Sequence, residues 1–531
     1  MTDELTLHDS LEKIIQQYKE NDYVYGRLTN YIEHLLPAAL NNANEVHKQR
    51  EERKTQLNAD RDEFTTRFLH KNNYFYCSQT EIFLKYDGVH FVVYSEDDIQ
   101  HQILTTISSE KCLREWKHKV NKNIIKRIKE RSPLNAIPES ATIQFVINML
   151  CPSVFPTRNH VKYFLTIIGE GVSIKTELKP DNNLTYIMSP NLTEIIREIG
   201  NKAYIYCGLP NIVNNIKYKY HDHTYSDCRL LFIENGNTTL PRKKIMIPPS
   251  FGKHIIDLLC VSVHYARRYG TADKYLQQCI EPKLVEHALF LSKNTQESIV
   301  NMFVEKSFTL CTSSTINTKN MFFIWKKFLD EKAVPNIIFY ETLKTLLKEK
   351  LKYEEVTDCF IGITSIHLPL VVNFMKFWEE TMLEMDDYGM CNDGEINANM
   401  NDHELEIDEV CCLFKGWSSA GKTINDALIL ELIRHFYPEV VITENKYMYN
   451  LKSKLWNKRA EVLTSLEQLK LDCKKDEMLS AVSIYDAYNF YSTTNKHNLL
   501  ASKQYFEKVT TSVLMDHVYL EGGVIMSTWW K

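Results

Sequence analysis

Apolar positions in the first 70 residues recur at steps of three and four, the spacing of one face of a helix. One stripe begins at Leu11, and a second begins at Tyr31 and is expected to stop near Pro37. Residues 44–68 are charged on all sides, which is typical of a solvated helix or of an arm that contacts a partner or nucleic acid. The pattern predicts a helical N-terminal segment over residues 1–70.

The pattern changes to strands beyond this segment. Residues 81–86 and 89–94 are rich in strand-forming side chains, and the Asp-Gly pair between them is a strong hairpin signal. Ser95 is placed to accept a hydrogen bond at the start of the next helix. Residues 71–150 are therefore expected to form a β-hairpin followed by helices.

Positive charge is concentrated in residues 114–131 of this region. At helical spacing, four of its lysines fall on one face while valine and isoleucine fall elsewhere. Such a stripe can neutralise phosphates in a salt-sensitive and sequence-independent way, or it can simply be a solvated face over a core contact. The candidate nucleic-acid-binding residues here are Lys117, Lys119, Lys122, Lys126, Arg127 and Lys129.

Two mainly apolar runs follow, at residues 163–168 and 228–233. Each is short and rich in branched or aromatic side chains, as buried strands of α/β proteins are. They predict a P-loop-like α/β core over residues 151–330.

The residues that follow the first run, 169–176, read GEGVSIKT. In a phosphate-binding loop the backbone N–H groups cradle the phosphates, a Lys reaches them and a Ser or Thr hydroxyl holds Mg²⁺. Ile174 stands where that loop needs its second glycine, and Asn235 breaks the acidic pair expected after the second run. The site is therefore a degenerate one, and its candidate nucleotide-binding residues are Gly169, Gly171, Lys175, Thr176 and Glu234.

Two other short motifs have simpler interpretations. Residues 416–423 match the phosphate-loop pattern letter by letter, but apolar residues at helical spacing precede them, so we expect a polar loop between helices. Residues 221–223 read His-Asp-His without further ligands nearby in the sequence, which favours a polar loop over a metal site. The sequence predicts neither a metal ligand nor a catalytic residue.

The C-terminal part contains an internal duplication after a helical segment (331–384) and an acidic linker (385–403). Residues 404–470 and 471–531 each predict two helices followed by two short strands. This order is that of tandem winged-helix-like domains, which bind either nucleic acid or protein. On the first wing the candidate phosphate contacts are Lys446, Lys452 and Lys454.

The totals narrow the class of protein. A chain of 531 residues with 44% hydrophobic residues predicts about three packed domains. The net charge of −5 excludes a general attraction to polyanions, so nucleic acid must be bound by a local patch. Thirteen cysteines without a C-x-x-C spacing indicate a reduced intracellular protein. A signal peptide and an apolar run of membrane-spanning length are both missing, so we expect no membrane partner.

The order of motifs resembles the poxvirus-type helicase–primase family of large nucleocytoplasmic DNA viruses and related phages. The motifs are a Tyr-Asp-Gly hairpin at residues 86–88, the loop at 169–176, CRLLFIE at 228–234, FWEE at 377–380 and FKGW at 414–417. The resemblance implies a superfamily-three helicase core before a winged-helix tail, with Lys175 and Thr176 as its Walker A residues. It also implies replication or expression proteins of a giant virus as partners, and a cytoplasmic viral factory or the virion as location.

The leading hypothesis is a viral helicase-like protein without intact ATPase motifs, acting without a cofactor as a scaffold that binds nucleic acid or the viral machinery. A first alternative is an active, atypical superfamily-three ATPase in viral DNA replication, with ATP and Mg²⁺. A second alternative is a structural or virion interaction protein. A homo-oligomer is compatible with each of these hypotheses.

Overall fold

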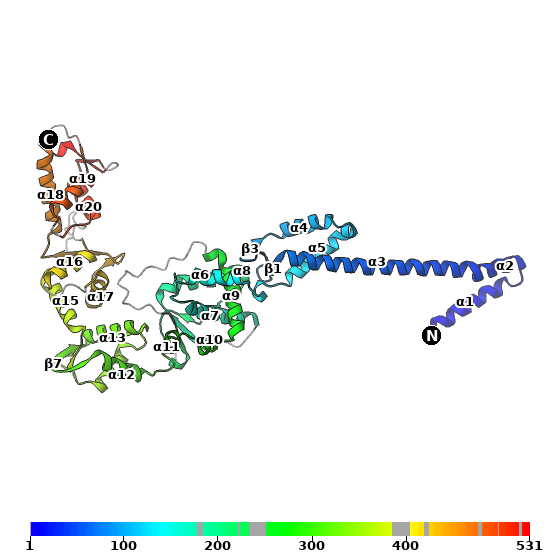
Figure 1. Cartoon of the computed structure of the whole chain (residues 1–531), viewed down its shortest axis with the longest axis horizontal. Helices are drawn as coiled ribbons and strands as arrows, with labels where there is room; N and C mark the ends of the chain where they lie inside the picture. Colours follow the sequence, from blue (N-terminus) through cyan, green and yellow to red (C-terminus); the bar gives the residue numbers. More distant parts are fainter. Residues whose placement is uncertain are drawn as a thin grey trace, which may run out of the picture. The chain divides into compact units, whose positions relative to one another are not determined.

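The computed structural model is mixed α/β, mostly helical, and its small sheets have two or three strands each (Figure 1). It describes residues 2–177, 184–220, 224–232, 251–384, 404–418, 424–475, 481–496, 499–519 and 523–530. The chain divides into two compact units. The first unit comprises residues 1–182, 192–215 and 247–285, and the second comprises residues 183–191, 216–246 and 286–531. The expected core of residues 151–330 therefore falls in both units.

The N-terminal helical segment is confirmed. It consists of α1 (Thr2–Tyr18), α2 (Asp22–Asn30), a π-helical turn (Tyr31–Leu35) and α3 (Leu36–Lys71). The expected stop near Pro37 is wrong, because the π-helical turn runs directly into α3 and this proline lies in the first turn of α3, inside a continuous helical stretch. The charged middle of α3 is exposed and carries i,i+4 pairs such as Lys48–Glu52 at 4.0 Å, as a solvated helix does.

The hairpin is also confirmed. Strands β1 (Asn73–Cys77), β2 (Ile82–Tyr86) and β3 (Phe91–Tyr94) form an antiparallel sheet in that order. The Asp87 carboxylate accepts hydrogen bonds from the N–H groups of Val89 and His90 at 2.8 and 2.7 Å, which closes the turn. Ser95 caps the following helix α4 (Glu96–Ser108) by accepting from the Asp98 N–H group.

The strand and loop expected at residues 163–176 are wrong. These residues lie inside α7 (Arg158–Glu177), a helix of 20 residues. From Tyr163 to Ile168 every side chain is buried, since α7 is surrounded by α6 (Ser140–Leu150), α9 (Ile255–Tyr269) and α10 (Ala272–Gln278). A helix buried on all sides shows no amphipathic period, so its apolar run cannot be told from a buried strand by pattern alone.

The glycines of the supposed loop serve the packing of this helix. A Cβ atom on Gly169 would lie 2.0 Å from the backbone oxygen of Ser262 in α9, and one on Gly171 would lie 2.0 Å from that of Ile212. These positions therefore need glycine because another backbone passes too close for any side chain. The Thr176 hydroxyl donates to the Val172 carbonyl at 3.0 Å, within the helix.

The second unit begins with a parallel sheet in the order β5 (Ile216–Lys217), β4 (Thr185–Met188) and β6 (Cys228–Phe232). The strand expected at residues 228–233 is thus confirmed over Cys228–Phe232, while Glu234 and Asn235 lie outside the described residues. The first unit holds α8 (Thr193–Cys207), the helix between β4 and β5.

Residues 282–384 are mainly helical but also contain strands. The helices are α11 (Pro282–Ala288), α12 (Gln296–Ser307), α13 (Thr318–Lys332), α14 (Tyr340–Lys350) and α15 (Leu368–Thr381). The expected helical segment at residues 331–384 contains α14 and α15, but also strands that the sequence did not indicate. Two of these strands, β8 (Tyr353–Glu354) and β9 (Cys359–Thr364), pair with β7 (Thr309–Asn317) in the order β7-β9-β8. The short strand β10 (Met382–Glu384) follows α15. The residues assigned to an acidic linker, 385–403, lie outside the described residues.

The duplicated order of elements is confirmed at the C-terminal end. The first repeat has β11 (Glu404–Glu406), α16 (Ile407–Trp417), α17 (Asp426–Phe436), β12 (Ile442–Thr443) and β13 (Tyr447–Tyr449). The second repeat has β15 (Ala481–Ser483), α19 (Ile484–Thr494), α20 (Lys503–Val513), β16 (Val518–Tyr519) and β17 (Val524–Met526). Both sheets have the same strand order, β11-β13-β12 and β15-β17-β16. The sequence pattern missed the first strand of each repeat and α18 (Lys458–Cys473), the helix before the second repeat.

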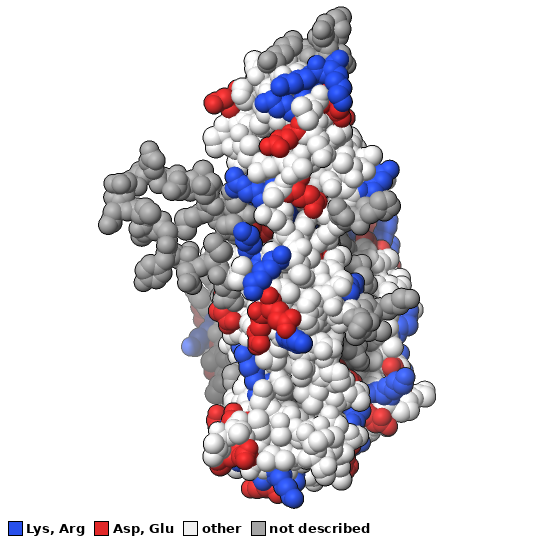
Figure 2. Space-filling view, turned by 90° about the vertical axis from the view of Figure 1, so that its left-hand side faces the viewer, with Lys and Arg blue, Asp and Glu red and all other residues white. Residues whose placement is uncertain are grey.

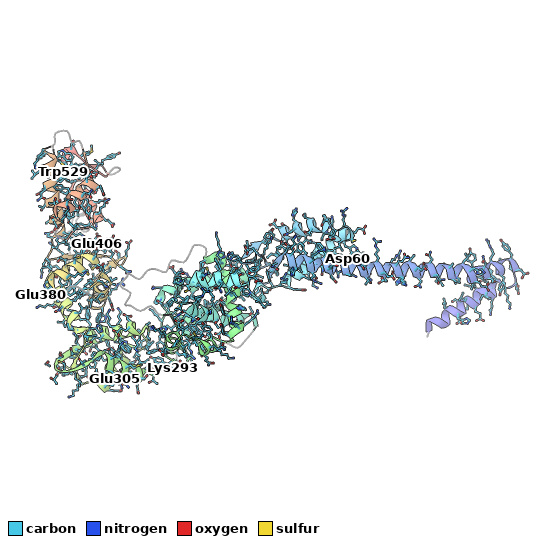
Figure 3. All side chains as sticks on the ribbon, viewed as in Figure 1. Asp60, Lys293, Glu305, Glu380, Glu406 and Trp529 are labelled. Atoms are coloured by element: carbon cyan, nitrogen blue, oxygen red, sulfur yellow. The ribbon has the colours of Figure 1, made fainter. Side chains whose placement is uncertain are left out.

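A buried ion pair joins the two repeats. Lys458, the first residue of α18, places its Nζ 2.6 Å from Glu409 Oε1 of α16, and both side chains are at most 5% exposed. The Lys458 ammonium also lies 3.9 Å from the ring centroid of Tyr505 in α20. The other oxygen of Glu409 accepts a hydrogen bond from the N–H group of Glu406, a residue marked in Figure 3. Each repeat has its own apolar core, so this polar contact helps to define how the repeats meet.

The Glu409 carboxyl makes the stability of this region depend on pH. Burial raises its pKa to about 7, although Lys458 and the Glu406 N–H group act in the opposite direction. The folded chain then keeps a proton that the unfolded chain releases near the ordinary value of 4.5. We therefore expect the free energy of unfolding to fall by about 3 kcal/mol as the pH rises from 4.5 to 7. Urea unfolding across this pH range should show the slope in the wild type and lose it in Glu409→Gln. An equal slope in both proteins would contradict the assignment.

Candidate nucleic-acid interface

Helix α5 (Lys117–Lys129) has one buried face and one charged face. Its buried residues are Val120, Ile124, Ile125 and Ile128. They pack in one cluster with Phe64 and Phe68 of α3 and with the apolar residues of α4. Because this packing fixes the rotation of the helix about its axis, the opposite, charged face is exposed to solvent.

The cations of α5 differ in what they contact. Arg127 lies 3.6 Å from Asp62 of α3, and Lys129 lies 3.6 Å from Glu96 of α4, so these two charges are partly neutralised. Lys119 lies over the ring of Trp116, 4.5 Å from a ring centroid. Lys117, Lys119, Lys122 and Lys126 are exposed and form no ion pair with the described residues. Lys119, Lys122 and Lys126 share the face opposite the buried residues, and we call these three lysines the α5 ridge. Lys117 lies at the start of the helix, on the same side as Ile124 and Ile128.

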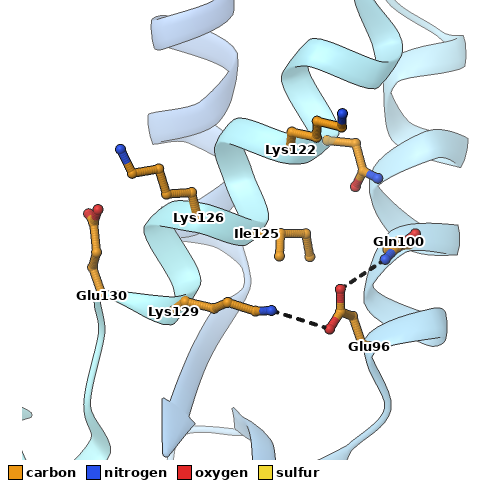
Figure 4. A pocket seen from close by; sticks show the side chains of 8 residues that line it. Glu96, Gln100, Lys122, Ile125, Lys126, Lys129 and Glu130 are labelled. Atoms are coloured by element: carbon orange, nitrogen blue, oxygen red, sulfur yellow. Dashed lines mark hydrogen bonds and ion pairs between the residues drawn. The ribbon is translucent and has the colours of Figure 1, made fainter. Parts of the chain in front are cut away.

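A shallow hollow of about 400 Å³ lies between α4 and α5, beside the ridge (Figure 4). In Figure 4 the Lys129 side chain reaches across to Glu96, which also accepts from Gln100 at 3.0 Å, while Lys126 points away from this pair. The three lysines and two glutamates that line the hollow, Lys122, Lys126, Lys129, Glu96 and Glu130, leave it a net charge of only +1 (3 − 2). Lys122 and Lys126 of the ridge are two of these lysines, so attraction of a polyanion must come from the ridge as a whole and not from the hollow alone.

The lysines expected to contact phosphates on the first C-terminal repeat are placed less favourably. Lys446 lies 2.7 Å from Glu406, whose side chain is buried, and Lys454 donates to the Glu380 carbonyl at 2.9 Å. Lys452 is exposed in β14 (Leu451–Ser453), which pairs with β10. On the face drawn in Figure 2, Lys and Arg lie in small groups among Asp and Glu and do not form one large basic patch.

The second helix of each repeat is engaged by neighbouring elements. In α17, Glu431 pairs with Lys327 and, at 3.6 Å, with Lys326 of α13, and the ring N–H of His435 donates to the Lys319 carbonyl at 2.9 Å. In α20, Lys508 lies 3.0 Å from Glu404 of the first repeat. A helix that binds in a DNA groove must have a free face. Part of the surface of α17 and of α20 is instead occupied by contacts within the protein.

The expected nucleotide-binding residues are not arranged as a phosphate loop. Gly169, Gly171, Lys175 and Thr176 all belong to α7, whose N–H groups are used by the helix itself. Lys175 is exposed near its C-terminal end, the end of a helix that repels phosphate. The other candidate, Glu234, and the motif at residues 221–223 lie outside the described residues, as do residues 419–423 of the motif at 416–423.

Comparisons with known proteins do not name a family. No family model, no curated protein and no solved structure matches the chain. In the part of the chain that the structure describes, no helix combines the length and the apolar character needed to span a bilayer. The candidate function therefore has to be argued from the residues alone.

Proposed function

We propose that this protein is a scaffold that binds nucleic acid through the α5 ridge, Lys119, Lys122 and Lys126. The observation that supports it is a helix whose apolar face is packed and whose opposite face presents lysines without ion pairs to described residues. Such a row of ammonium groups can replace the counterions of several phosphates, and release of these counterions drives binding without sequence preference. Because the net charge of the chain is −5, the rest of the surface does not attract a polyanion, and binding is directed to this local patch.

We propose further that the two C-terminal repeats are winged-helix-like modules that bind other proteins of the same machinery. The repeated order of helices and strands supports the first part of this statement, and the internal contacts of α17 and α20 favour protein over DNA as the partner. The assignment to a helicase-like viral protein, with the viral factory or virion as its location, rests on the order of sequence motifs. The helical state of residues 169–176 counts against the alternative of an active ATPase.

Charge reversal on the ridge tests the nucleic-acid proposal. In the triple variant Lys119→Glu, Lys122→Glu and Lys126→Glu, we expect the affinity for a labelled oligonucleotide of about 30 nucleotides to fall about 10- to 100-fold. Each lost phosphate contact also lowers the slope of log K against log salt by about 1, so the slope should fall by about 3. Fluorescence anisotropy at several salt concentrations, with single- and double-stranded DNA and RNA, measures both quantities.

The matched control changes the same amount of charge elsewhere. Lys283, Lys293 and Lys350 are exposed lysines on or beside other helices, and Lys293 is marked in Figure 3. Their triple replacement by Glu should leave the salt slope within about 1 of the wild-type value. Equal losses in the two triple variants would show that only net charge matters, and an unaltered affinity in the ridge variant would reject the interface.

A further inference from the structure

Two histidines and an aspartate from distant parts of the first unit meet at one point. His90 ends the β2–β3 turn, His254 is the residue before α9, and Asp257 lies in the first turn of α9. The Nδ1 atoms of His90 and His254 lie 2.8 and 3.1 Å from the same Asp257 oxygen, Oδ2. One potential ligand atom from each of the three residues lies within 4.8 Å of the other two.

The carboxylate at the centre is fully buried. The Asp257 side chain has an exposed fraction of 0%, and its other oxygen, Oδ1, accepts from the Phe91 N–H group at 2.8 Å. Within the described residues it pairs with neither Lys nor Arg, and burial raises the pKa of its carboxyl. A buried carboxylate without an ammonium or guanidinium partner is neutralised by its own proton, or its charge is balanced by a proton on an imidazole or by a bound cation.

The surroundings fix the two imidazole rings and leave one side open. The Phe145 ring lies edge-on to both, with centroids 4.5 Å from His90 and 4.7 Å from His254. The two imidazole centroids are 4.4 Å apart. The side chains of His90 and His254 are 26% and 20% exposed, so water and ions reach the cluster from outside.

The set of donor atoms matches that of zinc sites with an open position, which take three N and O ligands and a water molecule. Ligands at about 2.0–2.2 Å from a tetrahedral ion lie roughly 3.3 Å from one another. The separations of 2.8 and 3.1 Å to Asp257 Oδ2 need to widen by a few tenths of an ångström. The two histidine ligand atoms, which lie within 4.8 Å of each other, need to take the same spacing of roughly 3.3 Å. Imidazole and carboxylate without thiolate suit Zn²⁺ and similar divalent transition metals better than Mg²⁺ or Ca²⁺.

We propose that His90 Nδ1, His254 Nδ1 and Asp257 Oδ2 form a Zn²⁺ site whose fourth position is taken by water. The ion neutralises the buried carboxylate and joins the β2–β3 turn to the beginning of α9. The site differs from the α5 ridge and stands or falls independently of nucleic-acid binding. The sequence did not indicate it, because His90 and Asp257 are 167 positions apart and no motif connects them.

Metal titration of the full-length, reduced protein tests the site. Competition with a chromogenic chelator should show about one tightly bound Zn²⁺ per chain, and Co²⁺ should give visible d–d absorption without sulfur-to-metal charge transfer. His90→Ala and His254→Ala should each weaken Zn²⁺ binding by more than roughly 100-fold. Loss of a residue that only hydrogen-bonds to a metal ligand weakens binding by at most roughly 100-fold, so a larger effect indicates direct coordination. Zn²⁺ should also raise the melting temperature of the wild type and not that of these variants.

The control must distinguish this site from nonspecific Zn²⁺ binding to other side chains, since the chain has 18 His and 13 Cys. His118→Ala and Cys112→Ser change exposed potential ligands on other elements and should retain wild-type affinity. Far-ultraviolet circular dichroism must show that each variant is folded. The partly exposed histidines are changed instead of the fully buried Asp257 for this reason. Binding that is absent in the wild type, or that is equally strong in His90→Ala and His254→Ala, would overturn the proposal.

Discussion

Gly169→Ala is expected to destabilise the protein by about 3 kcal/mol. The new Cβ atom would lie 2.0 Å from the Ser262 backbone oxygen and 2.8 Å from the Ala266 Cβ atom. Both atoms belong to α9, a helix buried along most of its length, so the overlap can be relieved only by separating α7 from α9. Urea unfolding followed by circular dichroism measures the effect as a lower midpoint.

Gly416→Ala provides the matched control. Gly416 lies in α16, and an added Cβ atom there would meet no other atom within 4 Å. The free energy of unfolding of this variant should rise by about 0.5–1 kcal/mol, because Ala has a higher helix propensity than Gly. If Gly169→Ala did not lower the stability either, the close approach of α7 and α9 would be wrong. A loop at residue 169 would then again be a possible structure.

Lys458→Met is the second substitution for which a large effect is expected, a loss of about 3–5 kcal/mol at pH values above 7. Met has similar volume but leaves the Glu409 carboxylate buried without its partner, which lies only 2.6 Å away in the wild type. It also removes the cation above the Tyr505 ring. Urea unfolding of the full-length chain, read by the fluorescence of Trp456 and the other tryptophans, measures the loss.

Two further variants show whether the buried charge is responsible. Glu409→Gln added to Lys458→Met removes the unpaired charge while an amide oxygen still accepts from the Glu406 N–H group, so the double variant should recover most of the stability. Lys475→Ala breaks the exposed pair with Asp472 and should cost less than about 0.5 kcal/mol. A cost for Lys458→Met no larger than that of Lys475→Ala would mean that the pair is not buried in solution.

Turns, helix caps and apolar periods in the sequence predicted those elements whose structure depends on residues close together in the chain. The Asp-Gly turn and the Ser95 cap act over two or three residues, and both are formed as expected. In the C-terminal repeats one face of each helix packs on its own small core, so the period of apolar residues was visible in the sequence.

The same reasoning failed where an element is buried on all sides. Residues 163–168 carry no polar face, so strand and helix were equally compatible with their pattern, and the wrong one was preferred. The Gly-Glu-Gly and Lys-Thr letters then made the error look like a phosphate loop. In the fold Glu170 instead accepts from the Ala272 N–H group at 2.7 Å, where α10 begins.

The sequence by itself determined the helical N-terminal segment, the hairpin, the basic face of α5 and the two C-terminal repeats, because each is encoded by turns, caps and periods within about 20 residues. Only the tertiary structure decided that α7 is a helix, that its glycines lie against other backbones and that Lys458 is buried beside Glu409. It alone brought His90 to Asp257. Burial and proximity between distant residues depend on the packing of the whole chain, and no local pattern of side chains specifies them.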